Sequence, residues 1–364
     1  SNKKRIKGRT TLNHLIDRAF AAIALSALLA APAYAQKAYG PGASDTEIKL
    51  GQSTPLSGPA SAFGAGAGRA VVGYFEMLNA KGGINGRKIN FTQLDNAYSA
   101  PKAVEQSRKL IEDVGVLAEV GTIGTAPNVA IQKYLNGKQV PQLFITAGGR
   151  RFNDPKTFPW TIPLYPDFET EGRVVAKYIL TAKPDARIGV LYQNDDYGKD
   201  YLRGLRAGLG PKAELIVAQA SYELADPTID SQIVKLKATN ADVFVIAATP
   251  KFAAQSIRKA FEIGWRPMTF LSNTAVWIST VMQPAGVEAG TGIISTAYVK
   301  DPDDPVWKDD PGMKGWRDFM TRYLPEGDQH DTNYVNAYNS AMALEAVLKA
   351  CGDDLSTENI LRQA

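Results

Sequence analysis

Hydrophobic and polar positions along the chain predict an alternation of short buried strands and amphipathic helices. Short apolar runs are followed by stretches of helical spacing, with glycine and proline between them. The predicted strands are 48–53, 89–94, 116–120, 141–146, 187–192, 214–220, 243–247, 269–271 and 290–297. The predicted helices are 65–80, 101–112, 125–135, 169–180, 199–209, 229–238, 251–263, 313–323 and 333–350. This order is typical of parallel sheets with helices on both faces.

The junction around Thr125 is predicted to bind a small anion. The buried strand 116–120 runs through Gly121 and Gly124, which let the backbone turn sharply, into a helix that Thr125 would cap. Pro127 suits the first helical turn. Free N–H groups at a helix start point outward and carry partial positive charge, so this loop is a candidate seat for a carboxylate.

A proline-rich stretch, 158–166, interrupts the alternation and is predicted to separate two α/β halves. The expected parts are lobe 1 at 44–163 and 298–350, lobe 2 at 164–297, and residues 351–364 near a further crossing. Ligands of open parallel sheets bind beyond the carboxyl ends of the strands. The loops at those ends should therefore face a cleft between the two lobes.

The first 35 residues have the pattern of a secretory signal peptide. A basic lead precedes the apolar run 19–31, and Ala33-Tyr-Ala35 matches a small-x-small cleavage site. The thirteen-residue run is too short to span a bilayer, so a membrane anchor is the weaker interpretation. We therefore expect export to the periplasm.

Composition changes once this leader is set aside. It holds six of the 41 basic and one of the 37 acidic side chains, which leaves 35 against 36 and a net charge of −1. The basic pI of the whole chain is thus no argument for nucleic acid or an anionic membrane as a partner. Removing 35 of 364 residues leaves 329, a length comfortable for two lobes. Cys351, the single cysteine, cannot form an intrachain disulfide.

Few residues suit catalysis. His330 is the one histidine after the leader and lies in a polar loop, where we expect it to be exposed. No His/Cys cluster has metal-ligand spacing. Gly64-x-Gly66-x-Gly68 differs from a dinucleotide fingerprint and follows a long loop, so close helix packing explains it better. We expect neither cofactor nor metal, and an enzyme is disfavoured.

Three side chains in the predicted cleft loops could hold a ligand. Arg150 follows a strand end, where its guanidinium would bind a carboxylate opposite Thr125; a solvated surface position is an equal alternative. Phe63 and Tyr197 each precede a glycine in a cleft loop and could clamp a flat or branched apolar ligand, with core packing as the rival interpretation.

Several short motifs occur in a specific order and spacing. They are Pro55-Leu-Ser-Gly-Pro59, Phe63-Gly64, Asn79-Ala-Lys-Gly-Gly-Ile-Asn-Gly86, Asp95, Pro101-Lys-Ala-Val104, Gly121 to Thr125, Asp195-Asp-Tyr-Gly198 and Asp230 to Lys237. Through them the chain, from about Ile48 to its end, resembles the type I periplasmic solute-binding proteins of the branched-chain amino acid (leucine/isoleucine/valine) family, receptors of ABC importers. The resemblance implies an α/β fold of two Rossmann-like lobes, with parallel sheets flanked by helices, joined by a multi-strand hinge. It also implies a monomer that delivers its ligand to a permease and ATPase complex.

The resemblance also implies a set of ligand contacts. Phe63 matches an aromatic lid, Thr125 with Ala126 a carboxylate site, Gly149 and Arg150 a second carboxylate loop, Tyr197 the aromatic position of lobe 2, Thr249 a further contact loop, and Thr274 the position where the amino-acid binders keep an acidic residue for the ammonium. Those binders often carry a disulfide at positions that here read Tyr98 and Gly124, so packing must hold that corner.

The residue at Thr274 changes the expected ligand. A buried ammonium without a carboxylate partner is costly, so the chain should not favour a zwitterionic amino acid. Together with Arg150, Thr274 points to a carboxylate that lacks an amine. An aromatic acid, benzoate-like or phenylpropenoate-like, is favoured because Phe63, Tyr197 and Trp277 can stack on a ring.

Alternatives remain open. A branched or fatty carboxylate is the rival ligand, and Asp195 or Asp196 could restore binding of an amino acid. In the favoured mechanism the two lobes close around the ligand by bending near 161–165 and 295–298. A ligand-sensing ectodomain shares this fold. The sequence ends at Ala364 inside a predicted helix, and we expect further strands to follow in the complete protein.

Overall fold

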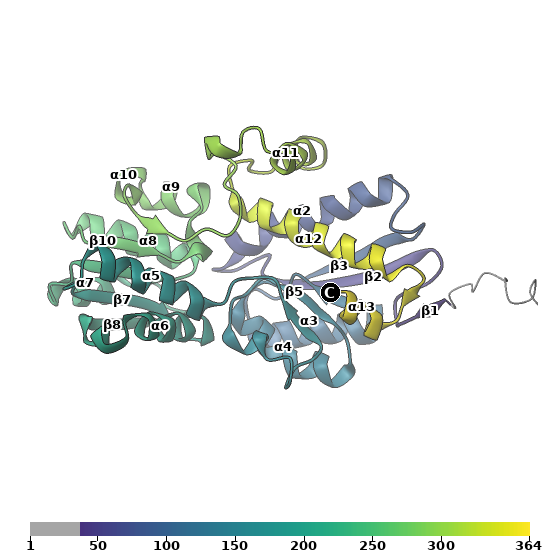
Figure 1. Ribbon diagram of the computed structural model, residues 1–364, viewed down its shortest axis with the longest axis horizontal. Helices are drawn as coiled ribbons and strands as arrows, with labels where there is room; N and C mark the ends of the chain where they lie inside the picture. The colour runs from purple at the N-terminus through teal and green to yellow at the C-terminus, as the bar shows by residue number, and fades with distance from the viewer. Residues whose placement is uncertain (1–36) are drawn as a thin grey trace, which may run out of the picture. The chain divides into compact units, whose positions relative to one another are not determined.

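Two parallel five-stranded sheets organise the computed structural model, which describes residues 37–364; the predicted signal peptide lies outside the described residues. The first sheet has the strand order β3-β2-β4-β5-β6, and the second has the order β11-β10-β9-β7-β8. A third, two-stranded sheet pairs β1 with β12. Helices cover the large sheets (Figure 1), which confirms the predicted α/β class.

The strands are β1 (Ala38–Tyr39), β2 (Glu47–Thr54), β3 (Lys88–Asp95), β4 (Ala118–Val120), β5 (Gln142–Ile145), β6 (Thr161–Pro163), β7 (Ile188–Gln193), β8 (Ile216–Tyr222), β9 (Val243–Ala247), β10 (Met268–Leu271), β11 (Ile294–Ser295) and β12 (Asp354–Leu355). The α-helices are α2 (Ser61–Ala80), α3 (Ala100–Arg108), α4 (Thr125–Lys138), α5 (Phe168–Ala182), α6 (Asp196–Leu209), α7 (Asp230–Ala238), α8 (Pro250–Glu262), α9 (Gln283–Ala285), α10 (Val287–Gly290), α11 (Pro311–Tyr323), α12 (Thr332–Cys351) and α13 (Thr357–Gln363). Shorter 3-10 or π turns are η1 (Lys109–Val114), η2 (Arg150–Asn153), η3 (Gly210–Leu215), η4 (Asn273–Ala275), η5 (Ile278–Met282) and η6 (Pro305–Trp307).

Two predicted helix starts differ from the structure. Gly124, with φ of 100°, is the N-cap of α4, so the expectation that Thr125 caps this helix is wrong; Thr125 is its first residue. Only glycine adopts that backbone conformation at little cost, and it therefore takes the cap position. Helix α2 begins at Ser61 and takes in the glycines at 64, 66 and 68. A Cβ at Gly64 would lie 2.1 Å from the Pro55 carbonyl oxygen, which confirms close packing as the role of this glycine.

The first sheet has its main core on the face covered by α2 and α12, which pack against each other, with α11 beside them (Figure 1). Fully buried aromatic side chains of this core include Phe75 and Trp316. A smaller apolar cluster joins α3 and α4 on the opposite face. Helices more than 200 residues apart in the chain, such as α2 and α12, thus complete one core.

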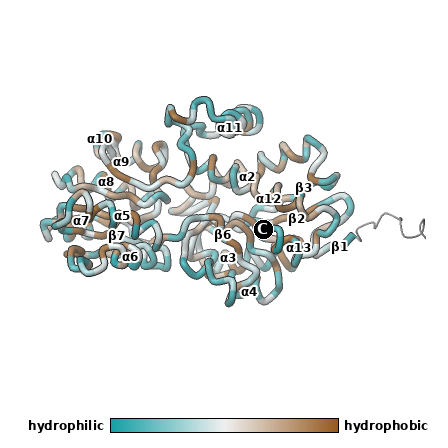
Figure 2. Tube along the Cα trace, in the orientation of Figure 1, coloured by the Kyte–Doolittle hydropathy of each residue, from teal (hydrophilic) through white to brown (hydrophobic). Residues whose placement is uncertain are grey.

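The second sheet is buried on both faces. Successive side chains of β9 point to opposite sides. Phe244 and Ile246 join the cluster under α7 and α8, whereas Val243 and Val245 join the cluster under α5 and α6. Strands buried in this way are continuously hydrophobic, as the brown segments of the trace indicate (Figure 2). The chain passes from the first sheet to the second between β6 and α5, and returns between β11 and α11.

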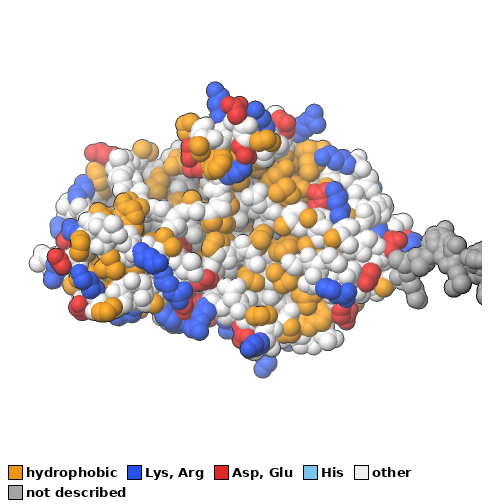
Figure 3. All heavy atoms as spheres, in the orientation of Figure 1, with side chains coloured by type: hydrophobic (Ala, Val, Ile, Leu, Met, Phe, Trp, Pro, Cys, Tyr) orange, Lys and Arg blue, Asp and Glu red, His pale blue; other side chains and the backbone are white. Residues whose placement is uncertain are grey.

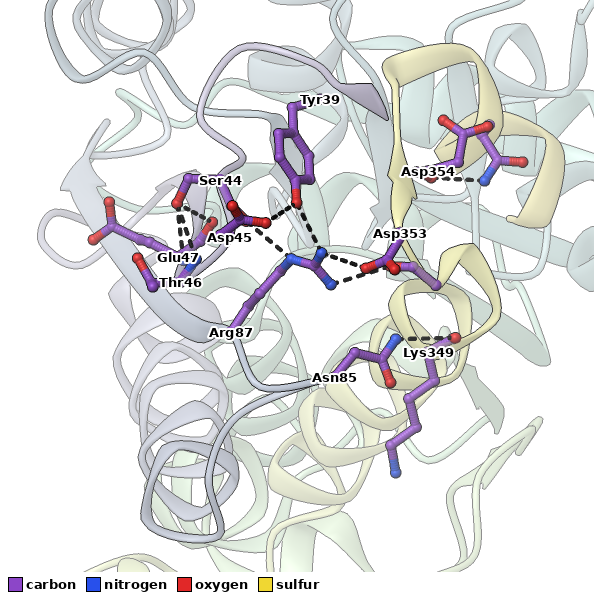
Figure 4. A network of polar contacts seen from close by, with 12 residues as sticks. Tyr39, Ser44, Asp45, Thr46, Glu47, Asn85, Arg87, Lys349, Asp353 and Asp354 are labelled. Carbon is purple, nitrogen blue, oxygen red and sulfur yellow. Dashed lines mark hydrogen bonds and ion pairs between the residues drawn. The ribbon is translucent and has the colours of Figure 1, made fainter. Parts of the chain in front are cut away.

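A buried arginine ties the start of the described chain to its C-terminal segment (Figure 4). Arg87 is 3% exposed and donates to the carbonyl oxygens of Ser44 and Gly352, to the Tyr39 hydroxyl and to Asp353 Oδ1, at 2.6–3.2 Å. The planar guanidinium can meet all four acceptors at once. It therefore links β1, the loop before β2 and the end of α12.

We expect Arg87→Ala to lower the free energy of unfolding by about 3 kcal/mol, because it leaves buried acceptors without a donor and removes packed side-chain volume. Urea unfolding followed by circular dichroism measures this change. Arg322→Ala, at an exposed position, serves as the control and should stay within about 0.5 kcal/mol. Equal stabilities of the two variants would contradict the structural role of Arg87.

Glu119 is a fully buried carboxyl group in β4. Neither of its carboxylate oxygens has a hydrogen-bond partner within residues 37–364. Burial raises the pKa of Glu119 to about 7, an effect that the nearby Ser107 hydroxyl offsets in part. The folded state therefore favours the protonated acid, whereas the unfolded chain ionises near pH 4.5. This contribution to stability is complete below pH 4.5 and is lost as the pH rises through 7.

Glu119→Gln is expected to stabilise the protein relative to the wild type at high pH only. The gain should grow between pH 5 and pH 8 to at most about 3 kcal/mol, because glutamine cannot ionise. Thermal or urea unfolding across that pH range measures the difference. The exposed Glu326→Gln provides the matched control. A stability difference that does not change with pH would show that Glu119 stays ionised in the folded protein.

Candidate ligand-binding cavity

A cavity lies between the two large sheets, at the carboxyl ends of their strands. From the first sheet, the start of α2 and the loops after β3, β4 and β5 reach it; from the second, the start of α6 and the loops after β9 and β10 do. The two crossing segments and the start of α12 complete its wall. This is the position predicted from the alternation of strands and helices.

Aromatic rings make up much of the wall. The seven aromatic lining residues are Phe63, Tyr98, Tyr165, Phe168, Tyr197, Trp277 and Tyr298. Phe63, on α2, packs edge-to-face with Trp277, beyond β10, with ring centroids 5.2 Å apart. Phe168 and Tyr197 lie 4.5 Å apart and are each 2% exposed. The cavity therefore offers flat apolar surfaces from both sheets.

The start of α4 supplies a polar end to the cavity. Thr125 is 2% exposed and lines it. The Asn128 side chain donates to the carbonyl oxygens of Thr122 and Gly124 at 2.9 and 2.8 Å, and the Gly124 N–H donates to the Thr146 carbonyl oxygen at 3.2 Å. These bonds fix the direction of the helix start. The N–H groups of Thr125 and Ala126 lack intrahelical partners, and the positive end of the helix favours a negatively charged group nearby.

Two further helices begin at this cavity. Thr249, the N-cap residue of α8, lines it, as do Thr332 and Asn333 at the start of α12. The lining contains no Lys, Arg or His among the described residues, and Asp301 is its one carboxylate. The electrostatic character of the site therefore comes from helix starts and hydroxyl groups instead of a basic side chain.

A chain of hydroxyl groups runs behind the wall on the side of the second sheet. The hydroxyl groups of Tyr197 and Thr274 lie 2.8 Å apart, and Thr274 Oγ1 donates to Ser272 Oγ at 3.2 Å. Ser272 Oγ and the Asn273 N–H donate to Glu171 at 3.2 and 2.7 Å. Burial raises the pKa of Glu171 to about 7, although these donors oppose the shift. Glu171 lies behind the wall and is not among the residues that line the cavity.

The structure brings five of the sequence-predicted site residues together. Phe63, Thr125, Tyr197, Thr249 and Thr274 all line the cavity. Ala126, Gly149 and Arg150 do not.

Gly149 nevertheless supports the wall from behind, because a Cβ at this position would lie 3.2 Å from Thr125 Cγ2. Ala126 is partly buried and follows Thr125 in the first turn of α4.

Arg150 lies outside the cavity, in a cluster of charged side chains. Its guanidinium is 68% exposed and lies 3.7 Å from Glu169 Oε1, while its N–H donates to Asp200 Oδ2 at 2.8 Å. Figure 3 shows acidic and basic side chains side by side where α6 approaches α4. The structure thus supports the alternative in which Arg150 is solvated surface, because its neighbours draw it to acidic groups of the second sheet.

Sequence reasoning missed several lining residues. They are Tyr98, Tyr165, Phe168, Tyr298, Asn333 and Asn336. Tyr98 carried a usable signal, since it follows the end of a predicted strand in the same way as the predicted contacts. Asn333 and Asn336 carried none, because only the packing of α12 on α2 brings them to the site.

Other chemistry is limited in the part of the chain that the structure describes. Residues 37–364 hold no group of three or more His, Cys, Asp or Glu side chains that could bind a metal ion. No helix in this range has the length and apolar character needed to cross a bilayer. His330 is exposed, as predicted, and its pKa is raised by Asp303, whose carboxylate lies 2.6 Å away.

Comparison with known proteins gives the family. The family described as Periplasmic binding protein matches residues 47–364. Leu/Ile/Val-binding protein homolog 7 of Brucella suis is 25% identical over 353 residues, which cover 93% of this chain and 84% of that protein. Leu/Ile/Val-binding protein homolog 3 of Brucella melitensis is 25% identical over 260 residues, or 69% and 68% of the two chains.

Solved structures share the fold. A substrate-binding periplasmic protein from Ralstonia solanacearum superposes with a TM-score of 0.79 at 23% identity, over 87% of this chain and 88% of its own. A fatty acid ABC transporter substrate-binding protein from Thermomonospora curvata gives 0.77 at 23% identity, over 90% and 82%. A branched chain amino acid ABC transporter from Thermus thermophilus with bound valine gives 0.78 at 17%, over 88% and 83%. The chain has the type I periplasmic binding protein fold and belongs to the periplasmic binding protein family, which consists of binding proteins and not of enzymes.

Proposed function

We propose that this chain is the periplasmic receptor of an ABC importer, and that it binds a small carboxylate without an amine and delivers it to a permease and ATPase complex. The observation that carries the proposal is the cavity itself. It has aromatic walls and a helix start at one end, and its lining holds no buried acidic residue that could receive an ammonium. Relatives named as Leu/Ile/Val-binding homologs and as a fatty acid ABC transporter protein support the transport role.

The acid head of the ligand is assigned to the start of α4. Thr125 supplies a hydroxyl group, and the first turn supplies the positive end of the helix dipole with the N–H groups of Thr125 and Ala126, since Pro127 has none. Arg150 is left out of the ligand contacts, because it lies in the exposed charged cluster. A carboxylate can be held without a basic side chain when preorganised donors surround it.

An ammonium group finds no suitable partner in this arrangement. The Thr274 hydroxyl is already hydrogen-bonded to Tyr197 and Ser272. Asp301 is exposed, and its Oδ1 accepts a hydrogen bond from the Asp303 N–H. Desolvating an ammonium beside hydroxyl groups alone is costly.

Neither acidic residue named as an alternative partner lines the cavity. Asp195 is the N-cap of α6 and accepts the Gly198 N–H, and Asp196 belongs to the charged cluster.

The aromatic wall favours an aromatic acid over a branched or fatty one. Phe63 and Trp277 pack edge-to-face on each other and both line the cavity, so a flat ring can pack against the apolar surface that the pair forms. A fatty acid is the second candidate, supported by the similarity to the Thermomonospora curvata protein. An amino acid is the third, since the Thermus thermophilus protein holds valine.

Contacts between the two sheets support a closed arrangement of the proposed lobes. Phe63 from the first sheet touches Trp277 from the second, and the Arg150 N–H reaches Asp200 across the same gap. Tyr165 and Tyr298, one on each crossing segment, pack at 4.9 Å. We propose that these crossings are the hinge between lobe 1 (44–163 and 298–350) and lobe 2 (164–297), and that ligand contacts on both sides favour closure.

Isothermal titration with benzoate, phenylpropenoate, octanoate, leucine and valine tests the ligand class. We expect the aromatic acids to bind most tightly and the two amino acids at least about tenfold more weakly, because their ammonium loses hydration without gaining an anionic partner. Tight leucine binding with no heat from any of the amine-free acids would overturn the proposed class.

Thr125→Val should weaken binding of the best carboxylate by about 2 kcal/mol, since it deletes a hydroxyl donor to a charged group while keeping the side-chain shape. Arg150→Ala, as the matched control, should change the affinity less than about twofold, because an exposed ion pair contributes little. Titration of both variants with one ligand measures the contrast. A larger loss of affinity in Arg150→Ala than in Thr125→Val would show that Arg150 contacts the ligand.

A further inference from the structure

Tyr98 has an unusual backbone conformation at the edge of the cavity. Its φ is 60° and that of Ala97 is 49°, values in the left-handed region that residues other than glycine adopt at a cost. The Tyr98 N–H donates to Asn96 Oδ1 at 2.8 Å, and Asn96 Nδ2 donates to Ser53 Oγ at 3.0 Å. Asn96 is fully buried, so the strained turn is anchored in the first sheet. The fold thus holds the tyrosine in one orientation.

The ring of Tyr98 covers the start of α4. A Cβ at Gly124 would lie 2.4 Å from Tyr98 Cε2, so the absence of a side chain at Gly124 makes room for the ring. The same ring stacks on Phe63 with centroids 6.4 Å apart, and Tyr98 is 6% exposed. It therefore closes the cavity at the end where the acid head of a ligand would lie.

The hydroxyl group of Tyr98 faces both sheets. Burial raises the pKa of Tyr98, and the neighbouring Gln193 side chain, at the end of β7, and Thr125 N–H offset part of this rise. Gln193 is itself fixed, because its Nε2 donates to Asp195 Oδ2 at 2.6 Å and its Oε1 accepts the Tyr222 hydroxyl at 3.0 Å. Tyr98 thus joins the loop after β3 in the first sheet to a buried polar group of the second.

We propose that Tyr98 is a specificity-determining residue: its ring limits how far a ligand can extend toward α4, and its hydroxyl group couples the acid-binding end to closure of the lobes. The inference rests on the proposed function and extends it to the length of the ligand. The Thr125 N–H neighbours the tyrosine hydroxyl, Pro127 has no N–H, and the Asn128 N–H donates to the Gly124 carbonyl oxygen at 3.3 Å. The acid head therefore ends at the Thr125 hydroxyl. A longer acid would have to displace the ring.

Tyr98→Ala and Tyr98→Phe separate the two roles. The ligands are benzoate, phenylacetate, 3-phenylpropanoate and 4-phenylbutanoate, which differ by one methylene at each step, and isothermal titration gives the dissociation constants. For Tyr98→Ala we expect the preferred acid to become longer by at least one methylene, because the alanine leaves the α4 end open. For Tyr98→Phe we expect about threefold to tenfold weaker binding of every acid with the same preferred length, since only one hydrogen-bonding group is lost.

Tyr178→Ala is the matched control, because it removes a half-exposed tyrosine outside the cavity and should leave the ligand profile unchanged. A Tyr98→Ala variant that folds and keeps the wild-type length preference overturns the length limit. Unchanged affinities of Tyr98→Phe overturn the coupling, and this variant keeps the ring should the alanine variant fail to fold. If the wild type binds none of these acids, the proposed ligand class fails instead; the length limit is then measured with alanine, valine, leucine and phenylalanine as ligands, with the same outcomes.

Discussion

The backbone conformation of Gly124 is the constraint on which the cavity depends. With φ of 100° the chain leaves β4, bonds back to the Thr146 carbonyl oxygen and starts α4 with its first N–H groups toward the cavity. Any side chain here would be strained and would also strike the ring of Tyr98. One glycine therefore sets both the direction of the helix dipole and the space that an aromatic neighbour fills. The crossing segments place the second sheet opposite the start of α4.

Sequence patterns predicted the parts of the fold that depend on local spacing. Every strand of the two large sheets was expected except the short β6, because a strand buried on both faces leaves a continuous apolar run. Thr125 and Tyr197, which line the cavity, were predicted to face it because the ends of parallel strands meet at one edge of a sheet. The N-cap of α4 was misplaced by one residue, since serine and threonine statistics do not include the φ that the turn requires.

The position of the Arg150 side chain could not be decided from the sequence. Its position after β5 was compatible with a ligand contact, and the sequence left a surface position as an equal alternative. The position of the Arg150 side chain depends on Glu169 and Asp200. Both belong to helices that cover the second sheet, and they approach Arg150 only when the two halves pack together. The same holds for Asn333 and Asn336, which α12 carries to the cavity from the far end of the chain. Contacts between residues that are far apart in the chain leave no local pattern in the sequence.

Glu171 connects the cavity wall to the segment that crosses between the sheets. This one buried carboxyl accepts hydrogen bonds from Ser272 and Asn273, after β10, and from Thr296 at 3.1 Å, after β11. Asn273 in turn accepts the Tyr165 hydroxyl at 2.5 Å, from the other crossing. A shift of either crossing must therefore disturb the donors around Glu171 or carry them along. Because an unpaired buried carboxyl is costly, the proposed closure favours a movement in which the donors around Glu171 stay with it.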